Sequence, residues 1–445
     1  MISSDCTLIP SFSALNKQEK KHVKHWLAAA VLCIVLSGIA PLLLLAGRAS
    51  IYAEMTQIKT WFVPVLVIHV NLSVGLWFIA LAMMFWRLYW PVKLPPIWHN
   101  GCIIAFLAGV LAMVTAPFAG GEAFTSNYIP VQNNPLFFFG LSLIFACLLC
   151  MIAPYLVALY REEKPQPLVA MNVLTLVAAL SCFALSVMQH PVGYGGESYY
   201  EAIFWGGGHV LQFLYVQITA LAWLWLGAYL HIALPSRKFL ITGFGLITLT
   251  AITSPIIYWF YDVNSYYHIK FFSWQMNIVT GTVPALLAVW LLFKLPMGTK
   301  RDALFWVLLS SIILFLSGGF VGFLIEGSNT IIPAHYHGST VGVTLALMGA
   351  AYLAIDKLGG KNISQWKMAK LQPVLYGAGQ LLHVIGFAIA GSEGVQRKVA
   401  GKMEGATELA QAGMQLTRVG GIFAVIGGGL FVVVMLRAWR QKSSD

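Results

Sequence analysis

The sequence predicts an all-α integral membrane protein, a bundle of about twelve transmembrane helices. Two observations carry this prediction. Hydrophobic residues make up 59% of the 445 residues and charged residues only 10%, whereas a soluble domain has about a quarter of its residues charged. The apolar residues also gather in runs of about 20, the length at which an α-helix crosses the hydrocarbon core of a bilayer.

The twelve runs follow one another with short polar connections, so we expect one membrane domain over residues 25–438. Short cytoplasmic tails are expected on either side, at 1–24 and 439–445. The runs are 25–46, 61–86, 97–118, 136–160, 168–189, 200–232, 238–260, 270–294, 303–326, 333–356, 372–391 and 419–437.

The basic residues indicate how the chain is oriented. With the N-terminus inside, 20 of the 27 Lys and Arg fall in inner segments, the bias that membrane insertion produces. This predicts both termini in the cytoplasm and a bacterial or archaeal cytoplasmic membrane. The net charge of +11 is therefore an orientation signal, and we expect lipid rather than nucleic acid as the surrounding partner.

Four of the seven outer basic residues lie together between the last two runs. This loop is either merely long, or it covers an anionic group. The sequence leaves both readings open. The four residues are Arg397, Lys398, Lys402 and Arg418.

Five histidines lie inside the runs, where polar side chains are costly and are often functional. Any one of them could instead be a hydrogen-bonded packing residue. In the expected orientation the first four lie at comparable levels in the outer part of the bilayer, as a haem-binding layer requires. The five are His69, His209, His335, His337 and His383.

The segment Pro333-Ala-His-Tyr-His337 adds a geometric prediction. Residues two apart on a helix differ by about 200° in direction, so His335 and His337 can each bind a different haem. His337 with His69 would make a six-coordinate, low-spin haem. His335 would hold a five-coordinate haem facing His209, because neutral imidazole is a common haem ligand. The alternative is a polar turn at the outer face.

These residues carry a resemblance to subunit I of the haem–copper oxygen and nitric oxide reductases, nearest to the nitric oxide reductase-like members. It spans nearly the whole chain and implies that family's helical fold. The matching motifs are H-x-N-L at His69, W-x-x-x-H ending at His209, and H-x-H at His335 and His337.

The resemblance also implies roles for individual residues. The first His of H-x-H binds the high-spin haem, the second binds the low-spin haem, and His209 is the first ligand of a second metal. The segment leading from His383 to Arg397 and Lys398 is similar to the family's helix that ends in a basic pair beside the haem propionates. Arginine is well suited to pairing with such carboxylates.

One departure from the family concerns the second metal, copper or non-haem iron. The family has a His-His pair late in the seventh helix, and Ile256 and Ile257 stand there. A single imidazole does not make a usual metal site. Whether this metal is bound stays open, with four residues as possible substitutes: Asp262, His268, Tyr258 and Gln212. The tyrosine that some oxidases carry after the sixth-helix His is Phe213 here.

The leading functional hypothesis is an oxidoreductase with two haems, b-type preferred, that reduces oxygen or nitric oxide. Electrons would come from a cytochrome c or a copper-containing subunit and pass from the low-spin to the high-spin haem. Few carboxylates lie in the runs, so we expect protons to enter from outside without pumping. Asp356 lies at an inner end, whereas Glu201, Asp262 and Glu326 lie toward the outer face.

Two alternatives come from other classes. The protein could keep its haems without catalysis, as an electron carrier or a gas-binding module, because the second metal site is incomplete. It could also be a solute transporter, a common role for twelve-span proteins that place substrate sites near the midplane. A colourless purified protein would favour the transporter.

Overall fold

The computed structural model describes residues 10, 12–48, 56–163, 165–189, 193, 195–296, 298, 301–397 and 406–441. Within these ranges, twelve segments are helical, long and apolar enough to cross a membrane. The predicted all-α fold with twelve spans is confirmed.

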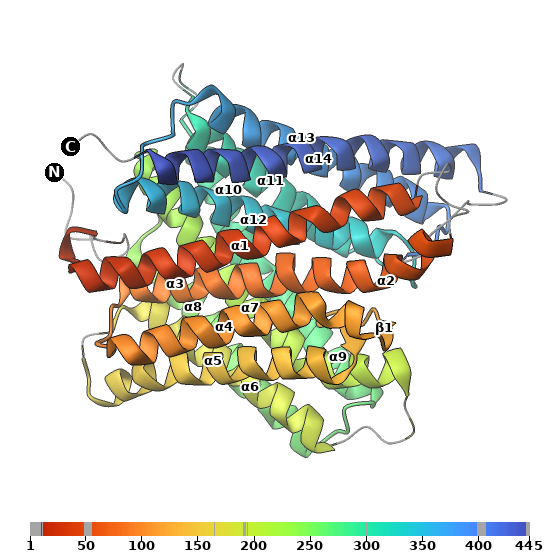
Figure 1. Cartoon of the computed structure of the whole chain (residues 1–445), viewed down its shortest axis with the longest axis horizontal. Helices are drawn as coiled ribbons and strands as arrows, with labels where there is room; N and C mark the ends of the chain where they lie inside the picture. The colour runs from red at the N-terminus through yellow and green to blue at the C-terminus, as the bar shows by residue number, and fades with distance from the viewer. Residues whose placement is uncertain are drawn as a thin grey trace. The chain divides into compact units, whose positions relative to one another are not determined.

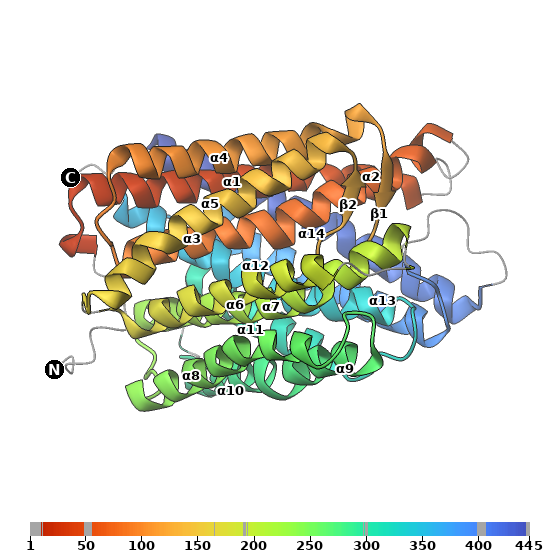
Figure 2. The same ribbon diagram turned by 90° about the horizontal axis from the view of Figure 1, so that it is seen from below.

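The described chain contains fourteen α-helices and one β-hairpin (Figures 1 and 2). The helices are α1 (Lys17–Arg48), α2 (Thr56–Val70), α3 (Trp77–Tyr89), α4 (Pro96–Thr115), α5 (Pro135–Tyr160), α6 (Pro167–Gln189), α7 (Gly196–Tyr229), α8 (Arg237–Thr253), α9 (Tyr266–Gln275), α10 (Thr282–Lys294), α11 (Ala303–Gly322), α12 (Ile331–Lys357), α13 (Lys367–Ser392) and α14 (Glu408–Arg440). The hairpin strands are β1 (Glu122–Phe124) and β2 (Val131–Asn133), which pair antiparallel.

Fourteen helices give twelve spans because two spans are interrupted. A π-helical segment, Asn71–Leu76, joins α2 to α3, and a second, Met276–Thr280, lies between α9 and α10. π-Helical turns often mark functional positions. The first of the two begins two residues after His69.

The first helix begins at Lys17, inside the segment expected to be a polar tail. Hydropathy identifies only the part of a helix that suits lipid, whereas lysine, glutamine and glutamate extend helices readily. The α-helix therefore starts about two turns before the apolar run at 25–46.

The chain divides into two compact units. One comprises residues 1–37, 63–220 and 235–284, and the other comprises 38–62, 221–234 and 285–445. The first unit holds His69 and His209, and the second holds His335, His337 and His383. The units are described separately below.

Close helix packing in the first unit depends on small residues. A Cβ added at Gly109 of α4 would lie 2.8 Å from the Gly140 carbonyl oxygen of α5, and the reverse substitution would produce the same clash. Glycine at such contacts lets two membrane helices approach backbone to backbone. The two helices run side by side in Figure 1.

The second unit uses the same device in α13 and α14. Glycines recur every seven residues, at 379 and 386 on α13 and at 413, 420 and 427 on α14. A Cβ at Gly379 would lie 2.6 Å from Ala424 N, and one at Gly386 would lie 2.4 Å from Gly413 O. The two helices therefore stay in close contact along their length (Figure 1), and this contact fixes the position of α13 against α14.

Candidate functional site

His69 lies in the last turn of α2 and is hydrogen-bonded to Ser37 of α1. Its Nδ1 lies 3.2 Å from the Ser37 carbonyl oxygen and 3.1 Å from Ser37 Oγ. A carbonyl oxygen only accepts, so Nδ1 carries the proton and donates. Nε2 therefore carries the lone pair of the neutral ring. The His69 carbonyl oxygen also accepts a hydrogen bond from Ser73 Oγ (2.6 Å).

Asn71, the third residue of the H-x-N-L motif, fastens the chain just after His69. Its side-chain amide donates to the Val67 carbonyl (2.9 Å) and to the Pro130 carbonyl (2.7 Å). The second bond ties this helix to the connection between β1 and β2. Asn71 is 8% exposed, so both bonds form out of contact with water.

His209 of α7 has hydrogen bonds at both ring nitrogens. Nδ1 lies 2.9 Å from the Trp205 carbonyl oxygen one turn earlier, and Nε2 lies 2.9 Å from the Tyr128 hydroxyl. Since Nδ1 donates to a carbonyl, Nε2 must accept from the Tyr128 O–H. The lone pair that a metal would use is thus already hydrogen-bonded.

Tyr128 reaches His209 from the β1–β2 connection. Two other residues of this connection are hydrogen-bonded to carboxylates of α7. The Glu201 carboxylate accepts from the backbone N–H and side-chain amide of Asn127, and Glu197 Oε1 accepts from Thr125 Oγ1 (3.0 Å). Burial, with a contribution from Glu201, raises the pKa of the Tyr128 hydroxyl well above its ordinary value. The phenol therefore remains a donor.

Three glycines before His209 make room for aromatic rings. A Cβ at Gly206 would lie 2.2 Å from the hydroxyl of Tyr258, and a Cβ at Gly208 would lie 2.2 Å from Cγ of Tyr128; at Gly207 it would meet the ring of Phe183 at 2.3 Å. None of these positions tolerates a side chain without a shift in its neighbour. The glycines of W-x-x-x-H are thus a packing requirement of this site.

The possible substitute ligands for a second metal differ in their burial and in their contacts. Tyr258 shares a hydrogen bond with Ser186 (2.8 Å), and Asp262 is exposed. His268 is fully buried, and its ring packs on Tyr258 with centroids 4.8 Å apart.

Ile256, at a position where the family has histidine, is 49% exposed. Gln212 is only half-buried. Among the described residues, no group of three or more His, Cys, Asp and Glu is placed to hold a metal ion. The described His, Cys, Asp and Glu residues therefore form no second metal site of the usual kind, and no step is assigned to such a metal.

His335 of α12 faces α11 in the second unit. Its Nδ1 lies 2.8 Å from the Gly318 carbonyl oxygen, so this nitrogen donates and Nε2 carries the lone pair. A Cβ at Gly322 would lie 2.7 Å from the same Nδ1, and a Cβ at Gly318 would lie 2.1 Å from Ser339 N. Gly322 therefore leaves room for the imidazole, and Gly318 lets the backbones of α11 and α12 approach closely.

His337 faces a different helix, α13. Its Nδ1 lies 3.2 Å from the Gln380 side-chain oxygen, and its ring lies 4.6 Å from that of His383, centroid to centroid. His383 in turn has its Nδ1 2.9 Å from the Thr417 carbonyl oxygen of α14. The two histidines of H-x-H therefore contact different helices, α11 and α13.

Arg397 lies close to the start of the helix that carries H-x-H. Its Nε donates to Ser328 Oγ (3.2 Å), and the adjoining residues Asn329 and Gln396 form a β-bridge. The Thr330 backbone N–H, just before α12, donates to the Val395 carbonyl (2.9 Å). Lys398, the second residue of the expected basic pair, lies outside the described residues.

One arrangement is common to the five histidines that the sequence analysis singled out. Each presents Nδ1 to an oxygen acceptor, which selects the tautomer with its lone pair on Nε2. Metal-binding histidines usually donate their second nitrogen in this way, because the bond fixes the ring and raises its basicity. Four of the five acceptors are backbone carbonyls, and the fifth is the amide of Gln380.

Two contributors were missed by the sequence reasoning, Tyr128 and Gln380. Tyr128 lies in a connection without periodicity, although the three glycines before His209 indicate that bulky groups approach there. Gln380 is an uncharged polar residue within an apolar run, and a buried polar group in a span normally has a partner. That signal was present in the sequence.

Comparison with known proteins identifies the family. Residues 21–428 match the family described as Cytochrome C and Quinol oxidase polypeptide I. The chain belongs to this family. Because the match covers most of the chain, the resemblance to haem–copper oxidase subunit I is confirmed, and with it the subunit I-like fold.

Two proteins and one solved structure are similar to the chain along most of its length. An uncharacterized protein of Rickettsia prowazekii (strain Madrid E) is 27% identical over 94% of this chain and 96% of its own length. An uncharacterized protein of Aquifex aeolicus (strain VF5) is 26% identical over 75% of this chain and 84% of its own. A heme-copper terminal oxidase dimer solved by cryo-EM shares the fold, with a TM-score of 0.77 at 16% identity, covering 97% of this chain and 86% of that one.

Proposed function

We propose that the protein is the di-haem membrane subunit of a respiratory-type enzyme that reduces oxygen or nitric oxide. The observation that carries the proposal is the pair His335 and His337. They stand two residues apart on α12, donate Nδ1 to acceptors on α11 and α13, and so each presents the Nε2 tautomer that binds iron.

The residue roles follow from the family motifs. His69 and His337 are assigned as the two axial ligands of a low-spin haem, and His335 as the single protein ligand of a high-spin haem. Haem supplies one-electron redox chemistry and a coordination position for a diatomic gas, with potentials set by its ligands and surroundings. We prefer b-type haem.

The chain's own residues orient these ligands and balance charge. Ser37 and Gly318 fix the rings of His69 and His335 through Nδ1. Arg397, beside the start of α12, is assigned with Lys398 to the haem propionates, because guanidinium pairs with carboxylates bidentately. This gives the unusual outer basic cluster a function.

Electrons would come from a donor outside this chain. The family description names cytochrome c and quinol, and we propose cytochrome c or a copper-containing subunit as the donor. Protons would enter from the outer face without pumping, since the carboxylates in the spans lie at their ends. We propose that both termini lie in the cytoplasm of a bacterial or archaeal cell, and the distribution of basic residues supports this orientation.

A second candidate function is a haem electron carrier or gas-binding protein without catalysis. It is favoured by two observations: His209 Nε2 accepts from Tyr128, and Ile256 and Ile257 stand at the positions where the family has its His-His pair. Isoleucine side chains cannot replace the metal ligands of that pair. Family membership argues against the solute transporter.

Purified protein distinguishes the candidates. We expect two haems per chain, and a reduced-minus-oxidised spectrum with low-spin b-type bands plus a species that shifts with carbon monoxide. Consumption of oxygen or nitric oxide with a chemical electron donor supports the enzyme. Two irons, no other metal and no gas consumption support the second candidate. Protein that carries no haem when produced with ample haem overturns both.

A further inference from the structure

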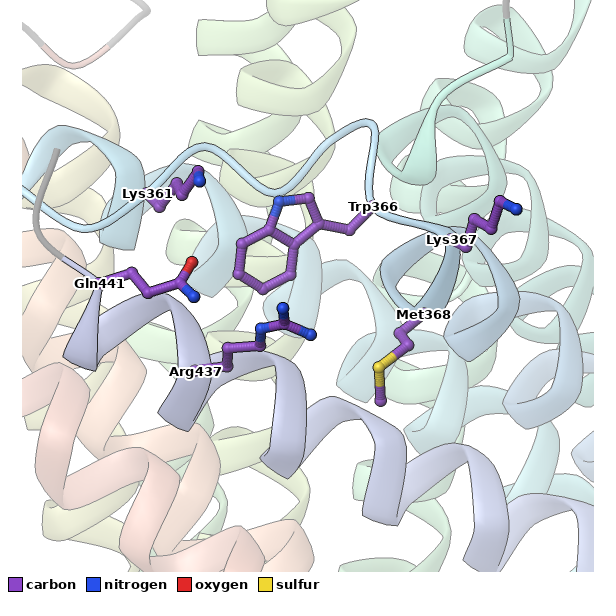
Figure 3. Close-up of a pocket in the computed structure, with 6 residues that line it drawn as sticks. All are labelled: Lys361, Trp366, Lys367, Met368, Arg437 and Gln441. Carbon is purple, nitrogen blue, oxygen red and sulfur yellow. The ribbon is translucent and has the colours of Figure 1, made fainter. Parts of the chain in front are cut away.

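A cavity of about 270 Å³ opens at the end of the second unit where α12 ends, α13 begins and α14 ends (Figure 3). Arg437 lies beneath the indole of Trp366 in this view, with Lys361 and Gln441 on one side of the ring and Lys367 and Met368 on the other. Six residues line it: Lys361, Trp366, Lys367, Met368, Arg437 and Gln441.

Three of the six lining residues are cations and none is a carboxylate. In the described part of the chain, the ion pair at this end joins Lys357 to Asp356 (3.9 Å), and neither Lys361 nor Arg437 takes part in one. Uncompensated positive charge in a concave site favours an anion. Gln441 adds an amide that can donate to it.

Arg437 is held in place by Trp366. Its guanidinium carbon lies 5.2 Å from the centre of the indole ring, within the range of a cation–π contact. Stacking uses the face of the guanidinium and leaves its N–H groups at the edge available to an oxygen ligand. A phosphate can accept two such bonds side by side.

The backbone fixes the lysine-bearing segment against α14. Lys361 N donates to the Ala438 carbonyl (3.3 Å), and a Cβ at Gly360 would lie 3.1 Å from the same oxygen. On the other side, the residue before α13, Trp366, provides no side-chain cap. The first N–H groups of that helix are therefore available at the cavity.

Apolar side chains continue from the cavity along the membrane-spanning helices. Leu371 and Val374 on α13 are 48% and 37% exposed, and Val433 and Leu436 on α14 are each 47% exposed. Met368 forms part of the cavity wall itself. A ligand that fits both features has a charged phosphate and hydrocarbon chains.

We propose that this cavity binds the headgroup of an anionic phospholipid. Its phosphate would contact Lys361, Arg437 and Gln441, while its acyl chains would run along α13 and α14. Basic pockets between transmembrane helices at the positively charged face are suited to such headgroups. The proposal is independent of the haem chemistry above.

The test is native mass spectrometry of the full-length protein in detergent with phosphatidylglycerol, and separately with phosphatidylcholine. Lys361→Gln/Arg437→Gln is compared with Lys370→Gln/Arg440→Gln, which removes the same charge from α13 and α14 without touching the cavity. Each basic residue near a lipid surface contributes roughly a kcal/mol, so the first variant should bind phosphatidylglycerol about 30-fold more weakly. The control should bind as the wild type does.

Other results overturn the proposal. Equal losses in the two variants would indicate general attraction to basic residues. Equal binding of phosphatidylcholine would exclude recognition of net negative charge. If millimolar inorganic phosphate displaces the lipid completely, the cavity is a free-anion site. Arg437→Lys serves as a folding check: because it keeps the charge but loses the stacked guanidinium, it should bind phosphatidylglycerol more weakly than the wild type and more tightly than Lys361→Gln/Arg437→Gln.

Discussion

Gly322→Ala should disturb His335 although glycine itself binds nothing. A methyl group at this position of α11 would lie 2.7 Å from His335 Nδ1 and 2.9 Å from Cε1. The matched control is Gly319→Ala on the same helix, where a Cβ would meet nothing within 4 Å. Both changes gain the same helix propensity, up to about 1 kcal/mol.

The size of the effect follows from these distances. Carbon and nitrogen atoms without a hydrogen bond pack at roughly 3.5 Å, so the imidazole must move by about 0.8 Å. That shift would stretch its 2.8 Å bond to the Gly318 carbonyl beyond hydrogen-bond range. Loss of such a supporting bond lowers metal affinity by about 10- to 100-fold, or about 1.4 to 2.7 kcal/mol.

The assay is the carbon monoxide difference spectrum of reduced protein, with haem content determined on the same sample. We expect Gly322→Ala to lose most of the carbon monoxide-sensitive species and to keep the low-spin bands. Gly319→Ala should match the wild type. A Gly322→Ala protein with an unchanged carbon monoxide spectrum would refute the assignment of His335 as the ligand of the gas-binding haem.

Two further predictions concern Tyr128. Tyr128→Phe leaves His209 Nε2 without its donor and should destabilise the protein by about 1 to 3 kcal/mol, which lowers the midpoint of thermal unfolding. The control Tyr160→Phe, at an 89% exposed position, should leave the midpoint unchanged. Equal midpoints for the two variants would contradict the hydrogen bond. Because the folded-state pKa of Tyr128 is raised, its stabilisation is complete below the ordinary tyrosine pKa of about 10 and is lost only as the pH rises through the higher folded-state value. The difference between wild-type and Tyr128→Phe absorbance titrations should therefore show no tyrosinate near pH 10, and Glu201→Gln should move that ionisation to lower pH.

The fold was largely predictable because lipid imposes a simple rule on sequence. A run of about 20 apolar residues has few alternatives to a spanning helix, and all twelve expected runs correspond to spans. The ends were less predictable: hydropathy does not register Lys17–Lys24 as helix, and it reads through the π-helical segment after His69 as one continuous run.

The site was predictable only in part, for a physical reason. Histidine is rare at depth and stands out, so the candidate ligands were evident. Their supporting partners are mostly backbone carbonyls, such as those of Ser37 and Gly318, which every sequence position possesses. Tyr128 reaches His209 through a hairpin that connects distant segments, and no local pattern encodes that contact.

The central claim is that α12 supplies ligands to two different haems, and the most direct measurement is the reduced-minus-oxidised spectrum of single histidine variants. His69→Ala and His337→Ala should each abolish the low-spin bands, whereas His335→Ala should remove only the carbon monoxide-sensitive species. Low-spin bands that persist in His337→Ala would contradict the account.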